Sequence, residues 1–318
     1  MSQAYQVFAK QKLAGSSPTM TQESQKQKKP AMPLTHFLVT DMTDFAFIDS
    51  GAGGIPYMNS LLSKKTDAKC VYIADNKNFP YGEKSHEEVV DCVVPLAKKV
   101  CEAFEPRVIV VACNTISVNA LEELRRRIPD VKFVGTVPAI KLAAGISKKR
   151  RLGLLATKAT VNNPYNDELM KNFASDCTLV TRGDAELVEF IEKKSFTATP
   201  EECEQAVLPA VEFFRSQDCD TIILGCTHFL HLRDVIQKVC GNELKVVDSV
   251  DGVVRHSLEV CYGGVAGVSP AQGGGRNEVR PRGETAPLLY VTGLLDETYK
   301  NQYQTLCARF NIEFKGAF

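Results

Sequence analysis

Short apolar runs alternate with longer segments of helical periodicity from Phe45 onwards. The runs are almost continuously apolar, which is typical of strands buried on both faces of a parallel sheet. We expect strands at FAFI (45–48), CVYIA (70–74), RVIVVA (107–112), KFVG (132–135), RLGLLA (151–156), CTLV (177–180), DTIILG (220–225), LKVVD (244–248) and LLYVTG (288–293). We expect helices over 89–104, 119–127, 185–194, 201–214 and 232–239. This alternation predicts an α/β fold.

The order of these elements occurs twice along the chain. One central strand is followed by ACNT and a later one by GCTH, so each half carries a cysteine after a strand. Cys113 precedes Gly135, the end of the next strand, by 22 residues, and Cys226 precedes the matching Asp248 by 22. We therefore predict two pseudo-symmetric doubly wound parallel-sheet domains with the active site in the cleft between them.

Composition shifts suggest where these domains begin and end. The stretch 16–33 is rich in Ser, Gln, Lys and Pro, and a later stretch is rich in Gly and Pro; neither has an apolar period. The expected parts are a flexible N-terminal extension (1–44), a first α/β domain (45–137 plus 249–318, with a surface insertion at 262–287) and a second α/β domain (138–248).

Charge and cysteine content exclude several classes of protein. Among 318 residues, Lys+Arg and Asp+Glu are both 38, and this balance argues against a nucleic-acid-binding protein. No apolar run approaches the roughly 18 residues of a membrane span, and the N-terminus lacks a signal-peptide core. The eleven cysteines are scattered without a CxxC pair, so we expect free thiols in the cytoplasm.

The two repeated cysteines are the strongest candidates for chemistry. Each follows a strand and opens a helix, where backbone N–H groups should lower the pKa of a thiol toward neutrality. The repeat aims Cys113 and Cys226 at one cleft from opposite sides. Inverting a carbon requires proton removal on one face and delivery on the other, which two opposed thiols can perform. This hypothesis needs no cofactor and no metal.

Polar residues at the other strand ends complete the predicted site. Asp49 precedes a Gly-rich turn, and its charge disfavours a phosphate there. Tyr81 lies in a Pro-Tyr-Gly turn whose backbone and hydroxyl can bind a polar substrate. Thr157 and Thr160 suit a carboxylate, although they could also be simple helix caps. His228 could tune the thiol of Cys226.

A zinc site is the alternative for part of this sequence. Cys226, His228 and His231 lie close together, but their spacing matches neither CxxC nor HExxH. We therefore predict no metal.

Five ordered motifs carry a resemblance to a known family. DSGAGG (49–54), FPYGEKS (79–85), VVACNT (110–115), ATKATV (156–161) and LGCTH (224–228) resemble the glutamate racemase family of the aspartate/glutamate racemase superfamily. The resemblance implies a cofactor-independent enzyme, usually a homodimer, that interconverts L- and D-glutamate and supplies D-glutamate for peptidoglycan. The alternatives are a racemase for aspartate or another amino acid, a related isomerase or decarboxylase, or a non-enzymatic dicarboxylate-binding protein.

The resemblance also assigns roles to residues. It implies that Cys113 deprotonates the D-enantiomer and Cys226 the L-enantiomer, with Asp49 assisting the first thiol and His228 the second. The family has a glutamate ahead of the second cysteine, for which Glu186, Glu189 and Glu192 compete; the spacing favours Glu192. Substrate contacts are expected at Asp49, Ser50, Tyr81, Gly82, Asn114, Thr115, Thr157, Thr160, Thr227 and His228.

Overall fold

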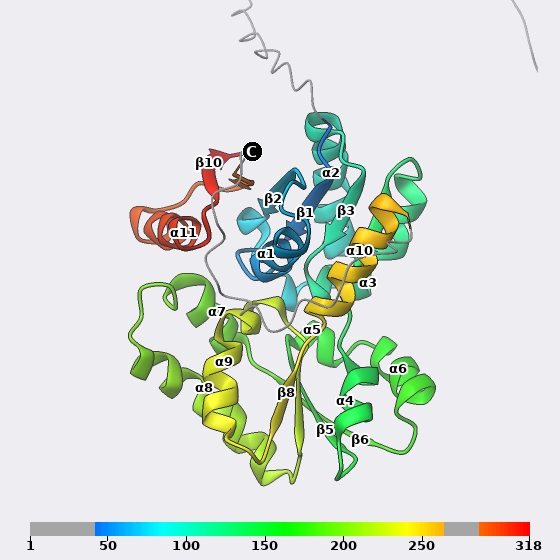
Figure 1. The fold of residues 1–318 in the computed structure, drawn as a ribbon, viewed down its shortest axis with the longest axis vertical. Helices are drawn as coiled ribbons and strands as arrows, with labels where there is room; N and C mark the ends of the chain where they lie inside the picture. The colour runs from blue at the N-terminus through cyan, green and yellow to red at the C-terminus, as the bar shows by residue number, and fades with distance from the viewer. Residues whose placement is uncertain (1–41, 264–285) are drawn as a thin grey trace, which may run out of the picture. The chain divides into compact units, whose positions relative to one another are not determined.

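The computed structural model describes residues 42–263 and 286–318. The predicted N-terminal extension and surface insertion therefore lie almost wholly outside the described residues. The described residues belong to one compact unit, in which helices surround two separate parallel sheets (Figure 1). Within these residues, no helix combines the length and apolarity needed to cross a bilayer.

The larger sheet has six parallel strands in the order β10-β9-β2-β1-β3-β4. These are β1 (Phe45–Asp49), β2 (Cys70–Ala74), β3 (Val108–Val111), β4 (Lys132–Gly135), β9 (Leu288–Val291) and β10 (Glu313–Ala317). Every residue of β1 is buried. Phe45 and Phe47 pack into one core, whereas Ala46 and Ile48 pack into the core on the opposite face. Two buried faces explain why this strand is continuously apolar.

The smaller sheet repeats the strand order of the larger one. It contains β5 (Arg151–Ala156), β6 (Thr178–Gly183), β7 (Thr221–Leu224) and β8 (Lys245–Val247) in the order β6-β5-β7-β8, again all parallel. The first four strands of the chain run β2-β1-β3-β4, so each strand of the smaller sheet has a counterpart in the larger one, whereas β9 and β10 have none. The predicted α/β fold with two pseudo-symmetric parallel sheets is confirmed.

The helices begin and end where local sequence signals place them. They are α1 (Ile55–Lys64), α2 (His86–Phe104), α3 (Asn114–Arg127), α4 (Ile140–Ile146), α5 (Lys158–Val161), α6 (Tyr165–Phe173), α7 (Ala185–Lys193), α8 (Pro200–Ser216), α9 (Arg233–Cys240), α10 (Val250–Tyr262) and α11 (Glu297–Phe310), with 3₁₀ turns η1 (Asn76–Asn78), η2 (Tyr81–Glu83) and η3 (Thr227–Leu232). Ser85 and Glu88 form a capping box that starts α2. The apolar period begins only after this polar first turn, which is why the predicted start at 89 is late.

The sequence pattern did not predict α1, α4, α5, α6, α10, α11 or β10, and two of these show opposite reasons. Residues Ile55–Leu62 of α1 are all buried, so the helix shows no polar face and no stripe of period 3.6. The edge strand β10 contains no fully buried residue, so it lacks an apolar run.

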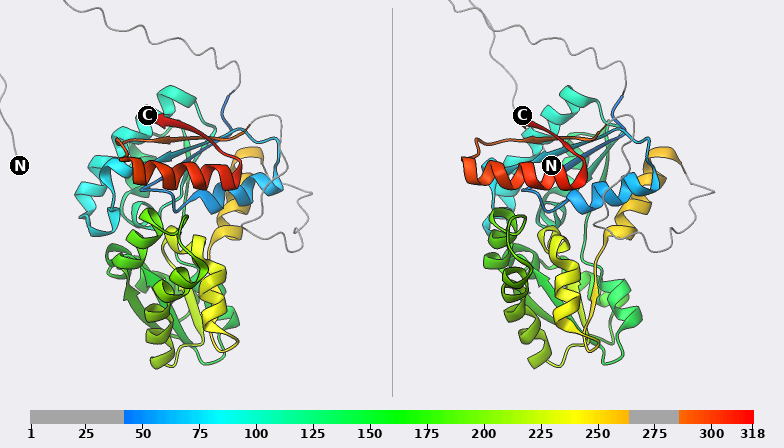
Figure 2. Two further views of the ribbon diagram at one scale, coloured as in Figure 1. Left: turned by 90° about the vertical axis from the view of Figure 1, so that its left-hand side faces the viewer. Right: turned by 60° about the vertical axis from the view of Figure 1, so that its left-hand side comes forward.

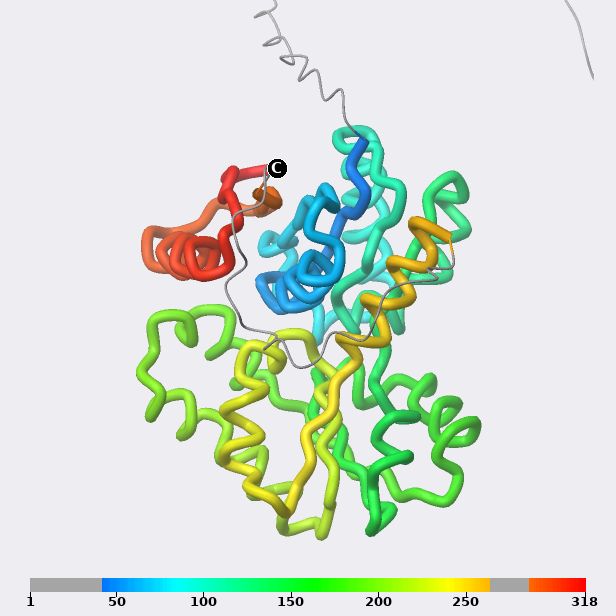
Figure 3. The backbone as a smooth tube through the Cα atoms, in the orientation of Figure 1, coloured from blue at the N-terminus to red at the C-terminus, as the bar shows by residue number. Residues whose placement is uncertain are grey.

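The chain passes between the two sheets twice, after β4 and after β8 (Figure 3). After α10, β9 and β10 add to the free edge of β2 in the larger sheet. Figure 2 shows α11, in red, on the same side of the larger sheet as α1, facing the four-stranded half, where it contacts α7. The predicted domain boundaries stay a prediction, but the C-terminal segment clearly joins the sheet of the first half.

Candidate active site

A cavity of about 390 Å³ lies where the carboxyl ends of the two sheets meet. Loops following β1, β3, β5 and β7 all contribute to its wall, as expected for parallel sheets. Of the predicted site residues, Ser50, Tyr81, Gly82, Cys113, Asn114, Thr115, Thr157, Cys226, Thr227 and His228 line it. The two repeated thiols therefore share one cavity.

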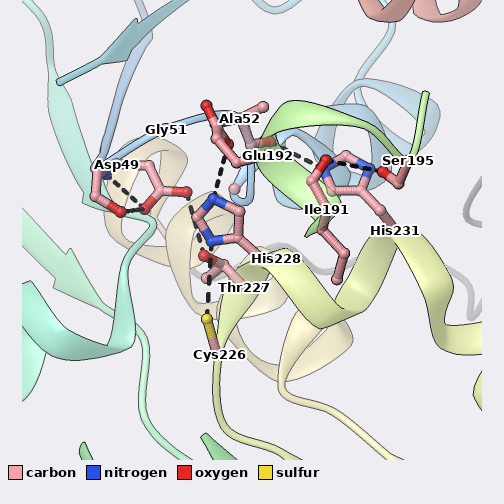
Figure 4. Close-up of polar contacts among 12 residues, drawn as sticks. Asp49, Gly51, Ala52, Ile191, Glu192, Ser195, Cys226, Thr227, His228 and His231 are labelled. Atoms are coloured by element: carbon pink, nitrogen blue, oxygen red, sulfur yellow. Dashed lines mark hydrogen bonds and ion pairs between the residues drawn. The ribbon is translucent and has the colours of Figure 1, made fainter. Parts of the chain in front are cut away.

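The Cys226 thiol faces a histidine that is itself held by a glutamate. Cys226 precedes the 3₁₀ turn η3, and its Sγ lies 3.7 Å from His228 Nδ1. His228 Nε2 lies 2.8 Å from Glu192 Oε2 (Figure 4). Glu192 and His228 are 0% and 2% exposed, so this is an interaction without solvent screening.

The electrostatics of this half favour an ion pair. Burial alone would raise the pKa of Glu192, but the contacts with His228, Tyr299 and Tyr303 lower it to about 2. Burial alone would lower the pKa of His228, but the contacts with Cys226 and Glu192 raise it well above its usual range. The result is an imidazolium between a carboxylate and the thiol of Cys226.

The structure separates the three competing glutamates. Glu192 is buried in the last turn of α7 against His228. Glu189 is exposed at the cavity mouth, where it pairs with Lys193, and Glu186 is exposed and outside the lining. Only Glu192 of the three contacts the thiol–histidine pair.

The Cys113 thiol has a different set of partners. Cys113 is the residue before α3, and its Sγ lies 3.9 Å from Ser50 Oγ. Asp49 Oδ1 accepts a hydrogen bond from the Ser50 N–H at 2.7 Å. Its Oδ2 accepts from the hydroxyls of Tyr72 at 3.1 Å and Thr227 at 3.2 Å. Asp49 thus lies behind the cavity wall and ties the first half to the loop after β7.

The predicted lowering of the Cys113 pKa is wrong. Burial and then the charge of Asp49 raise it well above its usual range, and the backbone N–H of Ile116 at the helix start offsets only part of this. Burial also raises the pKa of Asp49; Glu192 adds to this, while His228 opposes it. In this half the buried environment favours the neutral, protonated thiol.

Three threonine hydroxyls form a hydrogen-bonded group at the cavity wall. Thr115 Oγ1 lies 2.9 Å from Thr157 Oγ1, and Thr157 lies 3.0 Å from Thr160 Oγ1. Thr160 is fully buried and does not line the cavity, so it supports Thr157 from behind. A Cβ at Gly82 would lie 2.7 Å from Thr157, so only glycine permits the two halves to approach here.

Two side chains show what the cavity leaves free for a ligand. The Tyr81 hydroxyl donates to Asp75 at 2.5 Å, so this turn offers its backbone rather than the predicted phenol. Asn114 is 2% exposed, and within the described chain neither atom of its amide has a hydrogen-bond partner. A buried, unpaired amide in a cavity wall is a ready donor and acceptor for a bound molecule.

The described residues contain no cluster of three His, Cys, Asp or Glu side chains placed for a metal. His231 instead donates from Nε2 to the Ala52 carbonyl at 2.9 Å.

Sequence reasoning missed three tyrosines whose hydroxyls bind Asp49 or Glu192, namely Tyr72, Tyr299 and Tyr303. The last two are four residues apart on one helix, a spacing that signals a shared face but not what that face contacts.

Comparison with known proteins identifies the family. A family model described as Asp/Glu/Hydantoin racemase matches residues 55–256. A glutamate racemase of Treponema pallidum subsp. pallidum is 37% identical over 272 residues, which span 86% of this chain and 95% of that protein. The chain belongs to the Asp/Glu/Hydantoin racemase family. The prediction of an isomerase of the racemase class is confirmed.

Other glutamate racemases are also similar to this chain in sequence or in structure. A glutamate racemase of Proteus mirabilis is 38% identical over 211 residues, 66% of this chain and 73% of that protein. The solved structure of Escherichia coli glutamate racemase in complex with L-glutamate and the activator UDP-MurNAc-ala matches with a TM-score of 0.72 at 29% identity, over 86% of this chain and 98% of that chain. The isoform RacE1 from Bacillus anthracis, at 21% identity and a TM-score of 0.67, shares the fold.

Proposed function

We propose that this protein interconverts L-glutamate and D-glutamate by a two-thiol mechanism without a cofactor. The observation that carries the proposal is one thiol from each half in a single cavity. In the L-to-D direction, the Cys226 thiolate takes the α-proton, and the electron pair stays on the α-carbon. Cys113 then donates its S–H proton to the opposite face. The reverse direction exchanges the two roles.

The surroundings of each thiol suit this sequence of events. His228 Nδ1 lies 3.7 Å from the Cys226 sulfur, close enough to exchange a proton with it. Burial and Asp49 favour the protonated form of Cys113. In the proposed L-to-D direction Cys226 acts as the base and Cys113 as the acid. After one turnover from L- to D-glutamate, Cys226 carries the proton and Cys113 has lost its own. The original protonation of both thiols must then be restored before the next turnover.

We propose that the dicarboxylate is held by polar groups of the cavity wall. These are the amide of Asn114, the hydroxyls of Ser50, Thr115, Thr157 and Thr227, and the backbone of the Tyr81–Gly82 turn. The named activity of the relatives and the L-glutamate in the Escherichia coli structure support glutamate as the substrate. A racemase for aspartate or another amino acid is the alternative.

A chiral assay on a panel of amino acids tests the substrate. Glutamate should be racemised far faster than aspartate or monocarboxylic amino acids. Preference for another amino acid would overturn the assignment to glutamate. In D₂O, newly formed D-glutamate should carry α-deuterium while unreacted L-glutamate stays protonated, since donor and acceptor are different residues. Early deuterium in both enantiomers would indicate a single base.

The wider role is also part of the proposal. We propose that the enzyme is a cytoplasmic homodimer that supplies D-glutamate for peptidoglycan. Growth of a D-glutamate auxotroph carrying this chain tests the supply, and light scattering of the purified protein tests the dimer. Activity should survive EDTA, and the protein should show no pyridoxal absorbance, because the two thiols supply the acid–base chemistry.

A further inference from the structure

Glu192 accepts four hydrogen bonds, and two of them come from the C-terminal helix. Its Oε2 accepts from His228 Nε2 at 2.8 Å and from the Ala52 N–H at 2.9 Å. Its Oε1 accepts from the phenols of Tyr299 and Tyr303, each at 2.6 Å. One oxygen of the carboxylate thus serves the thiol–histidine pair, and the other is bound to α11.

The helix α11 is placed so that both phenols converge on this oxygen. Tyr299 and Tyr303 are four residues apart on one face, and their rings meet edge to face with centroids 5.5 Å apart. Tyr303 is fully buried, while Tyr299 also lines the cavity. Gln302 of the same helix donates to Thr197 Oγ1 at 2.6 Å, so α11 is also anchored independently of Glu192.

We propose that Tyr299 and Tyr303 are positioning residues for the Cys226 half of the reaction. Their hydroxyls hold the Glu192 carboxylate ionised and against His228, and His228 in turn supports the thiolate of Cys226. The importance of Cys226 rests on the proposed function, but the coupling of the phenols to the thiol does not. The C-terminal helix thereby acts on the sulfur of Cys226 through the two phenols, the Glu192 carboxylate and the His228 imidazole in turn.

The physical reason is the cost of a buried carboxylate. Without donors, a carboxylate removed from water takes up a proton, and it then no longer stabilises an imidazolium. The two phenols are among the contacts that lower the pKa of Glu192 to about 2, against the effect of burial. Burial raises the pKa of both phenols far above their usual range, so they remain donors.

Other titratable groups lie around Glu192 and the Cys226 thiol. The titratable groups that interact electrostatically with Glu192 or with the Cys226 thiol include His228, Asp49, Tyr57, Tyr72, Cys113 and His231. Of these groups, His228 alone lies within hydrogen-bonding distance of both Glu192 and Cys226. The effect of the phenols on the thiol therefore has one direct route.

The test measures the reactivity of the Cys226 thiol, not turnover. Tyr299→Phe, Tyr303→Phe and the double variant are each alkylated with iodoacetamide across a pH series, and labelling of the Cys226 peptide is followed by mass spectrometry. We expect the midpoint of the labelling curve to move to higher pH, by roughly one unit in the double variant, a tenfold change in the ionised fraction. The single variants should move it less.

Gln302→Met is the matched control, because it removes a buried contact of α11 without touching Glu192. Its labelling midpoint should equal that of the parent protein. An unchanged or lowered midpoint in the tyrosine variants would overturn the proposal, as would an equal shift in Gln302→Met. Circular dichroism selects folded variants, and either single variant suffices if the double variant does not fold. Because labelling needs no substrate, absence of glutamate racemisation would count only against the proposed function.

Discussion

The two halves of the molecule share a backbone plan but surround their cysteines with different chemistry. Both place four parallel strands in the same order and a thiol after the equivalent strand, β3 or β7. Beside Cys113 lie a serine hydroxyl and the buried acid Asp49. Beside Cys226 lies a histidine paired with Glu192. The repeat therefore sets the position of each thiol, and side chains that differ between the two halves set its surroundings.

This difference suits an enzyme that must hold one proton for two bases. Identical surroundings would give neither thiol a preference for holding that proton. The buried acid Asp49 lies behind Cys113 and the His228–Glu192 pair lies beside Cys226, so the two thiols have different proton-transfer partners. The pseudo-symmetry is thus geometric, while the asymmetry is electrostatic, and each can be tested separately.

The largest effect should come from removing either thiol. Cys113→Ala and Cys226→Ala should each abolish racemisation in both directions, because every turnover needs one donor and one acceptor. Cys219→Ala, a buried cysteine outside the cavity, is the control and should retain activity. Near-parental racemisation by either active-site variant, measured by circular dichroism of the substrate, would reduce the repeat to a purely structural feature.

Removing the charge beside Cys113 should have the next largest effect. We expect Asp49→Asn to slow turnover by roughly 10²–10⁴-fold, the usual contribution of an assisting acid–base group. Asp44→Asn removes a remote carboxylate that pairs with Arg107 and serves as the control. A normal kcat for Asp49→Asn would exclude this carboxylate from the mechanism.

A glycine beside Glu192 tests the geometry of the other half. A Cβ at Gly51 would lie 2.6–2.7 Å from the Glu192 carboxylate, whereas one at Gly252 in α10 would meet nothing within 4 Å. Displacing the carboxylate should cost Gly51→Ala about 10²-fold in kcat. Gly252→Ala should match the parent protein, and equal activity in the two variants would show that the position of Glu192 is not critical.

The smallest expected effect is on the pH dependence of stability, and it concerns His231. This histidine lies in the same 3₁₀ turn as His228 but differs from it in the direction of its pKa shift. Burial and then the charge of His228 lower the pKa of His231 to about 4, despite the bond to Ala52, in contrast to the raised pKa of His228. Because the folded pKa of His231 lies below its unfolded value of about 6.5, the folded form resists protonation. Its contribution to stability is therefore complete above pH 6.5 and is lost as the pH falls toward 4.

Urea unfolding of the parent protein and of His231→Gln measures this contribution. The difference in the free energy of unfolding between pH 7 and pH 4 should be smaller in the variant by at most about 3 kcal/mol. Asn59→Ala, which alters a buried polar residue without titrating, should keep the parental pH slope. A parental slope in His231→Gln would show that this histidine takes up its proton over the same pH range in the folded and unfolded states.

The sequence alone determined the strands, their repetition and the position of the two cysteines. Strands such as β1 and β3 are buried on both faces, so their continuous apolar runs were visible without any partner. The motifs around Cys113 and Cys226 follow such strands directly, and the carboxyl ends of parallel strands meet by geometry. These features depend on contiguous residues and on rules of chain connection.

Only the tertiary structure decided which groups surround each thiol. Glu186, Glu189 and Glu192 recur at intervals of three along one helix, so local periodicity could not choose among them. Tyr299 and Tyr303 reach Glu192 across 107 and 111 residues of chain. The protonation of a buried group depends on the charges and donors packed around it, whatever their distance in sequence. The position of Cys113 at a helix start predicted a lowered pKa for its thiol. In the folded protein, burial and the neighbouring Asp49 raise that pKa instead.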